Sequence, residues 1–141
     1  IDTNTYIQIL APDSTQIKNE NNVNNMSIVF RLIHGNSTVL LTGDLEKEGD
    51  QLLLSQKEFL NSDVLKVAHH GSITSTTHQL LNLITPDMAV ISVGKNNKFK
   101  HSSPIVLKRL VRSGSRIRRT DENGAIWIHS DGESIMEINW R

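Results

Sequence analysis

Two short stretches of the chain each run from an apolar strand into polar residues and then into a sequence that starts a helix. They are Leu40-Leu41-Thr42-Gly43-Asp44-Leu45-Glu46 and Leu65-Lys66-Val67-Ala68-His69-His70-Gly71-Ser72. At the carboxyl edge of an α/β sheet the chain turns and leaves the last side chain of a strand facing a crevice. A predicted helix over 46–54 and a linker separate the two stretches, which suits a crossover returning the second strand parallel to the first. We therefore expect Asp44 and His70 to face one crevice.

Asp44 and His70 carry groups that bind divalent metals. Carboxylate oxygen and neutral imidazole nitrogen are ligands for Zn²⁺, Mn²⁺ or Fe²⁺, and a pair of such ions can activate water and bind phosphoester oxygens. A second interpretation needs no metal, because Asp after Gly is often a helix N-cap and His-His-Gly can simply end a strand. The two stretches alone leave both interpretations open.

Length and composition narrow the classes of protein. A chain of 141 residues predicts one domain with a hydrophobic core. Lys and Arg together number 15, and so do Asp and Glu, which excludes a global basic field that would attract nucleic acid. Without cysteine, any metal ligands must come from His, Asp or Asn. No apolar run reaches the roughly twenty residues of a membrane span, and the chain starts without Met, so we expect a soluble piece of a longer protein.

Hydrophobic periodicity predicts an α/β alternation with antiparallel strands added at both ends. Strands are predicted over 6–10, 27–33, 38–42, 64–68, 88–93, 116–119, 125–129 and 134–140. One helix is predicted over 46–54, and a second, with Leu80, Leu81 and Ile84 on its apolar face, is capped by Ser75 or Thr76. A third starts at Pro104 with Ser103 as N-cap and ends at Gly114.

Five segments occur in the order and spacing of one known family. They are NNMSIVFRL at 24–32, LLTGDLE at 40–46, LKVAHHGSITS at 65–75, AVISVGKNN at 89–97 and RTDENGAIWI at 119–128. With them the chain resembles the C-terminal metallo-β-lactamase-like domain of the ComEC family of DNA-uptake channels of competent bacteria. The resemblance covers nearly the whole chain from about Asn24.

The resemblance implies an α/β fold that is half of an αββα sandwich, with a mixed sheet and helices on one face. The family's His-x-His-x-Asp-His motif, which supplies most ligands of the first metal, does not occur in residues 1–141 and is expected upstream of Ile1. We therefore expect residues 1–141 to be a partial domain. Its sheet should expose an apolar face, and we expect self-association through that face.

The resemblance also assigns roles to polar residues of the two stretches. It implies that Asp44 bridges two divalent ions, zinc or manganese, and that one of His69 and His70 binds the second ion; we favour His70. His69 is then expected either to support a metal ligand by hydrogen bonding or to face the phosphate as a catalytic group, because adjacent strand residues point to opposite sides and only one can reach a given ion. Ser72, with the backbone amides of Gly71 and Ser72, is expected to hold an anionic oxygen.

Further candidates lie outside these stretches. Asn24 or Asn25 stands where many relatives have a metal-binding His, and Asn24 is expected to contact substrate. His101 is either a catalytic phosphate ligand or loop packing, and relatives commonly have Gly before it and Pro after it. Asn97 and Lys100 are expected to bind substrate, with Lys98 adding positive charge.

The roles of Asp121 and of a run of arginines each have two interpretations. Asp121 either hydrogen-bonds an active-site His or belongs to an ordinary turn. A run of arginines either tracks a DNA backbone or forms a solvated face. These are Arg109, Arg112, Arg116, Arg118 and Arg119.

The resulting hypothesis is a metal-dependent phosphodiesterase, a nuclease that hydrolyses the DNA strand that is not imported during uptake, with single-stranded DNA as its expected partner. It would be the soluble domain of a plasma-membrane channel protein, on its extracytoplasmic side, completed by the missing upstream half. One alternative is a free-standing phosphodiesterase acting on cell-wall polymer or a small molecule. The other is a DNA-guiding module without catalysis.

Overall fold

The computed structural model describes residues 4–14, 17 and 21–139, and it contains a six-stranded mixed sheet in which the strands follow one another in sequence order. The strands are β1 (Thr5–Ala11), β2 (Val29–His34), β3 (Ser37–Leu41), β4 (Val64–Lys66), β5 (Met88–Ile91) and β6 (Arg116–Arg119). β1, β2 and β3 pair antiparallel, whereas β3 to β6 pair parallel. The predicted mixed sheet is confirmed.

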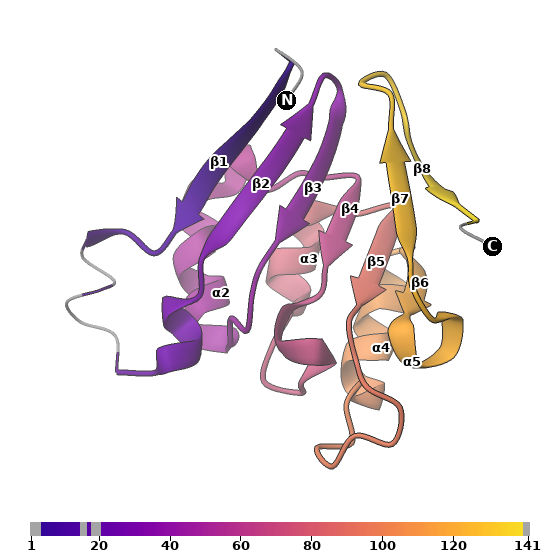
Figure 1. Ribbon diagram of the computed structural model, residues 1–141. Helices are drawn as coiled ribbons and strands as arrows, with labels where there is room; N and C mark the ends of the chain where they lie inside the picture. Colours follow the sequence, from indigo (N-terminus) through magenta and orange to yellow (C-terminus); the bar gives the residue numbers. More distant parts are fainter. Residues whose placement is uncertain (1–3, 15–16, 18–20, 140–141) are drawn as a thin grey trace.

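Three helices connect the parallel strands and cover one face of the sheet (Figure 1). They are α2 (Lys47–Leu53), extended by the 3₁₀ helix η2 (Leu54–Phe59), then α3 (His78–Ile84) and α4 (Pro104–Arg112). Crossovers of one hand that add strands in one direction place every helix on the same side. Ser103 caps α4, with its Oγ accepting the backbone N–H of Ile105 at 3.3 Å, and Pro104 is the first helical residue, as predicted.

The start of α3 differs from the prediction. Thr77, not Ser75 or Thr76, is the N-cap, and its Oγ1 accepts the N–H of Leu80 at 3.3 Å. Thr76 has φ +52°, outside the extended backbone of an N-cap. The buried Ser75 hydroxyl lies 2.9 Å from the carbonyl oxygens of Ala68 and Ser72. Ser75 therefore stabilises the preceding turn and does not begin the helix.

The core lies between the sheet and the helices. Leu40, Leu65 and Ala89 pair across β3, β4 and β5 in one register row. They pack with buried residues of the helices, namely Leu53, Leu80, Leu81, Ile84, Val106 and Leu110. The predicted apolar face of α3 is therefore confirmed as core.

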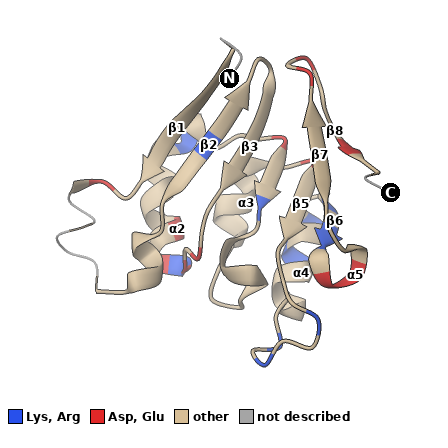
Figure 2. Cartoon of the chain, in the orientation of Figure 1, with Lys and Arg blue, Asp and Glu red and all other residues tan. Residues whose placement is uncertain are grey.

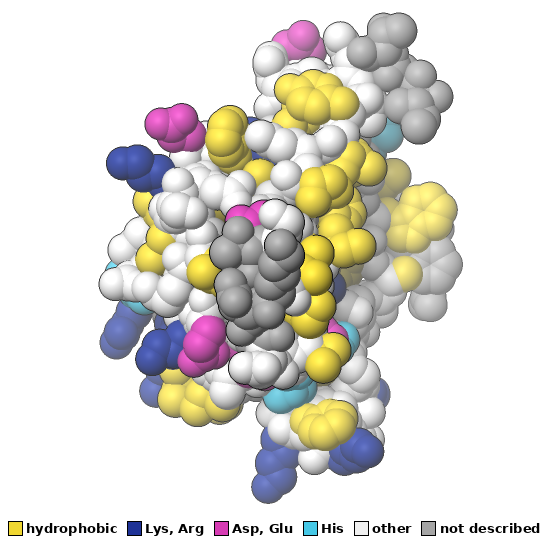
Figure 3. All heavy atoms as spheres, turned by 90° about the vertical axis from the view of Figure 1, so that its left-hand side faces the viewer, with side chains coloured by type: hydrophobic (Ala, Val, Ile, Leu, Met, Phe, Trp, Pro, Cys, Tyr) yellow, Lys and Arg dark blue, Asp and Glu magenta, His cyan; other side chains and the backbone are white. Residues whose placement is uncertain are grey.

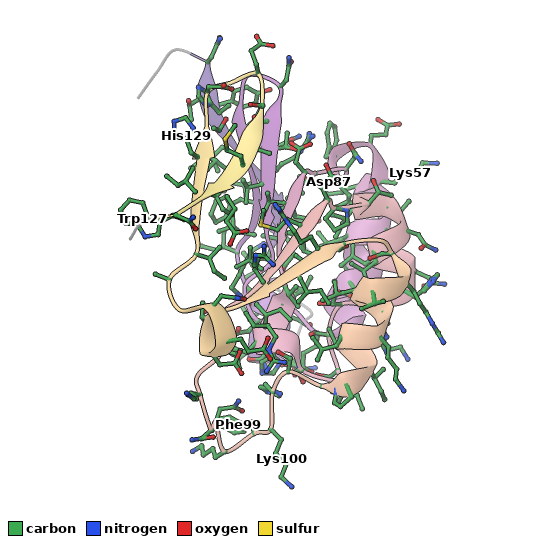
Figure 4. The ribbon with its side chains drawn as sticks, turned by 90° about the vertical axis from the view of Figure 1, so that its right-hand side faces the viewer. Lys57, Asp87, Phe99, Lys100, Trp127 and His129 are labelled. Atoms are coloured by element: carbon green, nitrogen blue, oxygen red, sulfur yellow. The ribbon has the colours of Figure 1, made fainter. Side chains whose placement is uncertain are left out.

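The sheet's other face carries a separate hairpin of β7 (Trp127–Ser130) and β8 (Ile135–Ile138), which follows the short helix α5 (Thr120–Asn123). Figure 4 shows this hairpin and the helices on opposite sides of the sheet. Glu137 of β8 accepts from Arg118 Nε at 2.7 Å, and Ser130 Oγ lies 3.0 Å from His34 Nδ1. The last two predicted strands thus form a hairpin outside the main sheet.

The face beside the hairpin is apolar along β1. Ile7 and Ile9 pair with Leu32 and Phe30 and are more than half exposed. Figure 3, a view onto the β1 side of the molecule, shows hydrophobic side chains gathered along one flank. Within the described ranges, no helix combines the length and apolar character that a bilayer span requires.

Candidate functional site

The ends of the parallel strands bring the candidate residues together at one edge of the sheet. Asp44 follows β3, and His69 and His70 lie in the 3₁₀ turn η3 (Ala68–Gly71) after β4. His70 Nε2 lies 3.6 Å from Asp44 Oδ1, and each side chain is about half exposed. The sequence predicted this convergence.

A backbone carbonyl fixes the orientation of the His70 ring. Its Nδ1 lies 2.7 Å from the carbonyl oxygen of Ser92, in the loop after β5. A carbonyl only accepts, so Nδ1 carries the proton and donates, and in the neutral ring Nε2 keeps a lone pair on the side of Asp44. Metal-ligating imidazoles usually have this arrangement, in which the second nitrogen donates to a carbonyl or carboxylate.

Asp44 is not a helix cap. The N-cap position of α2 is Glu46, and it makes no side-chain capping bond. The backbone N–H of Asp44 donates to Ser27 Oγ at 3.0 Å, just before β2, and its carboxylate stays open toward His70. The N-cap interpretation of Asp44 was therefore wrong.

The histidine pair does not sit in a strand, as the assignment of opposite sides to His69 and His70 assumed. β4 ends at Lys66, and His69, His70 and Gly71 have φ of 47°, 55° and 77°. Three successive left-handed residues make a tight turn, so both imidazoles reach the same edge of the sheet. A Cβ on Gly71 would lie 2.8 Å from the Cβ of Ser102, so only glycine fits there.

Glu46 is a site residue that the sequence interpretation missed. Its Oε1 lies 3.3 Å from His69 Nδ1, although the alignment is too poor for a hydrogen bond and that buried nitrogen has no other partner. Asn24 and Asn22 donate their side-chain amides to Glu46 at 3.1 and 3.0 Å. Asn25 Oδ1 accepts the Glu46 backbone N–H at 2.9 Å. An acidic residue two positions after Asp44, in the same loop, was the available signal.

These contacts set the charge of Glu46 and occupy Asn24. Partial burial raises the pKa of Glu46, but the amide hydrogen bonds from Asn24 and Asn22 and the charge of His69 outweigh it and leave the pKa below its ordinary value. Glu46 is therefore ionised beside His69. The Asn24 amide is engaged in holding Glu46, so its predicted contact with substrate stays a prediction.

His101 closes the other side of the site. Its ring centroid lies 5.7 Å from that of His69 and 5.8 Å from that of Phe99, on which it stacks. Burial and the neighbouring His69 and His70 lower the pKa of His101. A cleft of about 420 Å³ opens between His70, His101 and the loop after β5. That volume is in the range of small-ligand sites.

Two predicted substrate-binding residues lie away from the pair. Ser72 is buried, and its Oγ lies 2.9 Å from Thr74 Oγ1. Lys100 is exposed at the tip of the loop below the site (Figure 4). Asn97 lines the cleft, but its side chain bonds to the carbonyls of Gly94 and His101 and to the N–H of His101. The structure thus brings together Asp44, His69, His70 and His101, and leaves Ser72 and Lys100 outside this group.

Several charged side chains are engaged in contacts within the chain. Arg119 forms a two-pronged pair with Asp121, at 3.0 and 2.6 Å, so Asp121 contacts an arginine and not an active-site histidine. Arg118 pairs with Glu137, and Arg109 donates to the carbonyls of the turn before α3. Three of the five arginines considered as a DNA track are therefore occupied.

The side chains that could bind a metal are of the right kind but few in number. Asp44 and His70 converge with the right chemistry, yet within the described part of the chain no group of three or more His, Cys, Asp or Glu is arranged to hold an ion. A catalytic zinc usually has three protein ligands. The two donors therefore fit part of a metal site.

Comparison with known proteins identifies the family. The family profile of the metallo-beta-lactamase superfamily matches residues 24–95. The chain is 41% identical to ComE operon protein 3 of Bacillus subtilis over 84% of its length. It is 38% identical to Competence protein ComA of Neisseria gonorrhoeae over 73%, and 36% identical to Recombination protein 2 of Haemophilus influenzae over 88%. It spans about 15% of the length of each. These matches confirm the resemblance to the ComEC family, and the chain belongs to the metallo-beta-lactamase superfamily.

Proposed function

We propose that this chain contributes Asp44 and His70 to the metal centre of a phosphodiesterase that hydrolyses DNA during uptake. The observation that carries the proposal is the pairing of His70 Nε2 with Asp44 at 3.6 Å while Nδ1 is fixed on the Ser92 carbonyl. An imidazole ring held by a carbonyl, with its other nitrogen toward a carboxylate, is what such a ligand pair needs. The relative named Competence protein ComA supports a role in competence, and hence in DNA uptake.

Each residue of the site then has a defined task. Asp44 and His70 would hold a divalent ion, zinc or manganese, and the bound ion would supply Lewis-acid stabilisation of the phosphoryl oxygens. His69 lies beside the ionised Glu46, with 3.3 Å between Nδ1 and Oε1, and would contact a phosphate oxygen. His101 would protonate the leaving oxygen, and its lowered pKa makes the protonated ring a stronger acid for that step.

The proposal includes partners that lie outside residues 1–141. Two donors are too few for a catalytic ion, so the remaining ligands are proposed to come from an upstream segment of the parent protein. That parent is proposed to be a plasma-membrane DNA channel, with this domain on its extracytoplasmic side and single-stranded DNA as its substrate.

A DNA-guiding module without catalysis is the second candidate. The small donor set among the described residues favours it, because a decayed site would retain some ligands and lose others. The two candidates differ in whether the complete domain holds a metal.

The test uses the complete metallo-β-lactamase-like domain of the parent protein. Metal content and cleavage of single-stranded DNA are measured with Mn²⁺ and with Zn²⁺ for the wild type, Asp44→Ala and His70→Asn. Asn is chosen because it tolerates the left-handed backbone at position 70. Asp87→Ala and His129→Ala, exposed residues far from the site in Figure 4, are the matched controls.

We expect the two site variants to lose metal and to cleave at least about a hundredfold more slowly, since removing an outer partner of a ligand already costs ten- to a hundredfold. The two controls should retain both properties. A folded complete domain that binds no metal and cleaves nothing would favour the guiding module. Undiminished cleavage in either site variant would refute the assigned ligands.

A further inference from the structure

The loop between β5 and α4 presents an exposed aromatic ring among lysines. Phe99 is 67% exposed and lines the cleft together with His70 and His101. Between Ser92 and Ser103 the chain has three lysines and no acidic residue, although the chain as a whole is neutral. Figure 2 shows this loop as a basic projection at the end of the molecule where the parallel strands finish.

The Phe99 ring is held in place by its neighbours. It stacks on His101 with an angle of 19° between the rings and a centroid separation of 5.8 Å. Lys98 Nζ lies 5.0 Å from the Phe99 centroid. An exposed cation–π contact of this kind is weaker than the stacking of a base on an aromatic ring. A base can therefore displace the Lys98 ammonium, which is free to turn to a phosphate.

The loop is braced before any ligand arrives. Asn97 donates to the carbonyl oxygens of Gly94 and His101, at 3.1 and 2.6 Å, and accepts the His101 N–H at 2.9 Å. The Lys100 N–H donates to the Asn97 carbonyl at 3.2 Å. Binding to a prearranged loop loses little conformational entropy. In this structure the Asn97 side chain therefore stabilises the loop.

We propose that Phe99 is a stacking platform for a base of single-stranded DNA, whose flanking phosphates contact Lys98 and Lys100. The inference rests on the proposed function for its substrate and adds how the strand is held at the cleft. An aromatic face beside exposed cations matches the base and backbone of an unpaired strand, whereas a duplex keeps its bases stacked inside. The platform lies next to His101, which in turn neighbours His69. A stacked base would therefore place its own phosphate beside these two histidines.

The proposal is tested by binding to the full 141-residue chain in EDTA, where no metal-dependent cleavage can occur. Fluorescence anisotropy is measured with labelled (dT)12, with an abasic strand of the same length, with (rU)12 and with a DNA duplex. We expect (dT)12 to bind about tenfold more tightly than the abasic strand, a difference of about 1.4 kcal/mol. (rU)12 should bind within tenfold of (dT)12, and the duplex more weakly.

Phe99→Ala should remove the preference for (dT)12 over the abasic strand, and Phe99→Trp should retain it. Phe99 is 67% exposed and stacks on His101 of the same loop, so its removal leaves the core intact. Phe59→Ala, at another exposed phenylalanine, is the matched control and should behave as the wild type. Lys98→Ala and Lys100→Ala should each reduce the slope of log affinity against log salt by about 0.7, with Lys57→Ala as control.

Equal affinity for (dT)12 and the abasic strand, or an unchanged preference in Phe99→Ala, would overturn the platform. Tighter binding of duplex than of (dT)12 would overturn the single-stranded assignment, and a preference above tenfold for (rU)12 would overturn the DNA assignment. Because the binding is measured without metal, a failure here is distinct from a failure of Asp44 and His70 to support cleavage.

Discussion

Asp50 makes the stability of this protein depend on pH in the direction opposite to that of an ordinary surface carboxylate. It is 0% exposed in α2, and its Oδ2 accepts the N–H of Thr77 at 2.6 Å while Oδ1 makes no hydrogen bond. Burial raises the pKa of Asp50 to about 6, against the opposing hydrogen bond from Thr77 and the charge of Arg109.

The size of the effect follows from that shift. A rise from 3.8 to about 6 corresponds to roughly 3 kcal/mol between the two protonation states. The folded state binds the proton more tightly than the unfolded chain, so this stabilisation is complete below pH 3.8 and is lost as pH rises through about 6. Between pH 4.5 and 7.5 the loss is roughly 2 kcal/mol.

The assay compares wild type and Asp50→Asn by urea unfolding across that pH range. Asn keeps an oxygen that can accept the Thr77 N–H but does not titrate. The free energy of unfolding of the wild type, minus that of the variant, should fall by roughly 2 kcal/mol as pH rises. Asp87→Asn, at an exposed position, should give no such trend. A flat difference for Asp50→Asn would refute the argument that burial raises its pKa.

Three other substitutions test separate features of the fold. Gly71→Ala combines a left-handed φ with a clash against Ser102 and should lower the free energy of unfolding by about 2–4 kcal/mol in thermal melts. Gly114→Ala has φ +81° but open space around it, so it should cost only about 1 kcal/mol, and equal losses would contradict the clash. Self-association through the apolar β1 face should appear in light scattering and weaken in Ile9→Glu, whose wild-type side chain is 60% exposed. A wild type that stays monomeric at high concentration would count against that face.

Local signals predicted the fold well. Ser103 followed by Pro104 starts α4 because a hydroxyl cap and a fixed φ act within one helical turn. The helix-facing row of Leu40, Leu65 and Ala89 follows from apolar strands in a parallel sheet. Such patterns depend on neighbours in sequence, which is why they are visible without a structure.

The site was predictable only in part, because its details depend on contacts between distant segments. The convergence of Asp44 and His70 followed from strand ends, but the left-handed turn of the histidine pair is set by packing that no residue pattern displays. Glu46 lies beside His69 only because the segment before β2 folds over it. The group that orients His70 is the backbone carbonyl of Ser92, and because every residue has a backbone carbonyl, the sequence does not reveal it.

The spatial order of the strands, which equals their order in the chain, has a consequence for how the sheet is assembled. Each strand can pair with the one synthesised just before it, so no strand must wait for a distant partner, and long loop closures are avoided. One edge of the growing sheet is always β1, and the other is the newest strand. The last strand to join, β6, ends that growth with Arg116, Arg118 and Arg119, and charged side chains on an edge strand oppose pairing with a further chain.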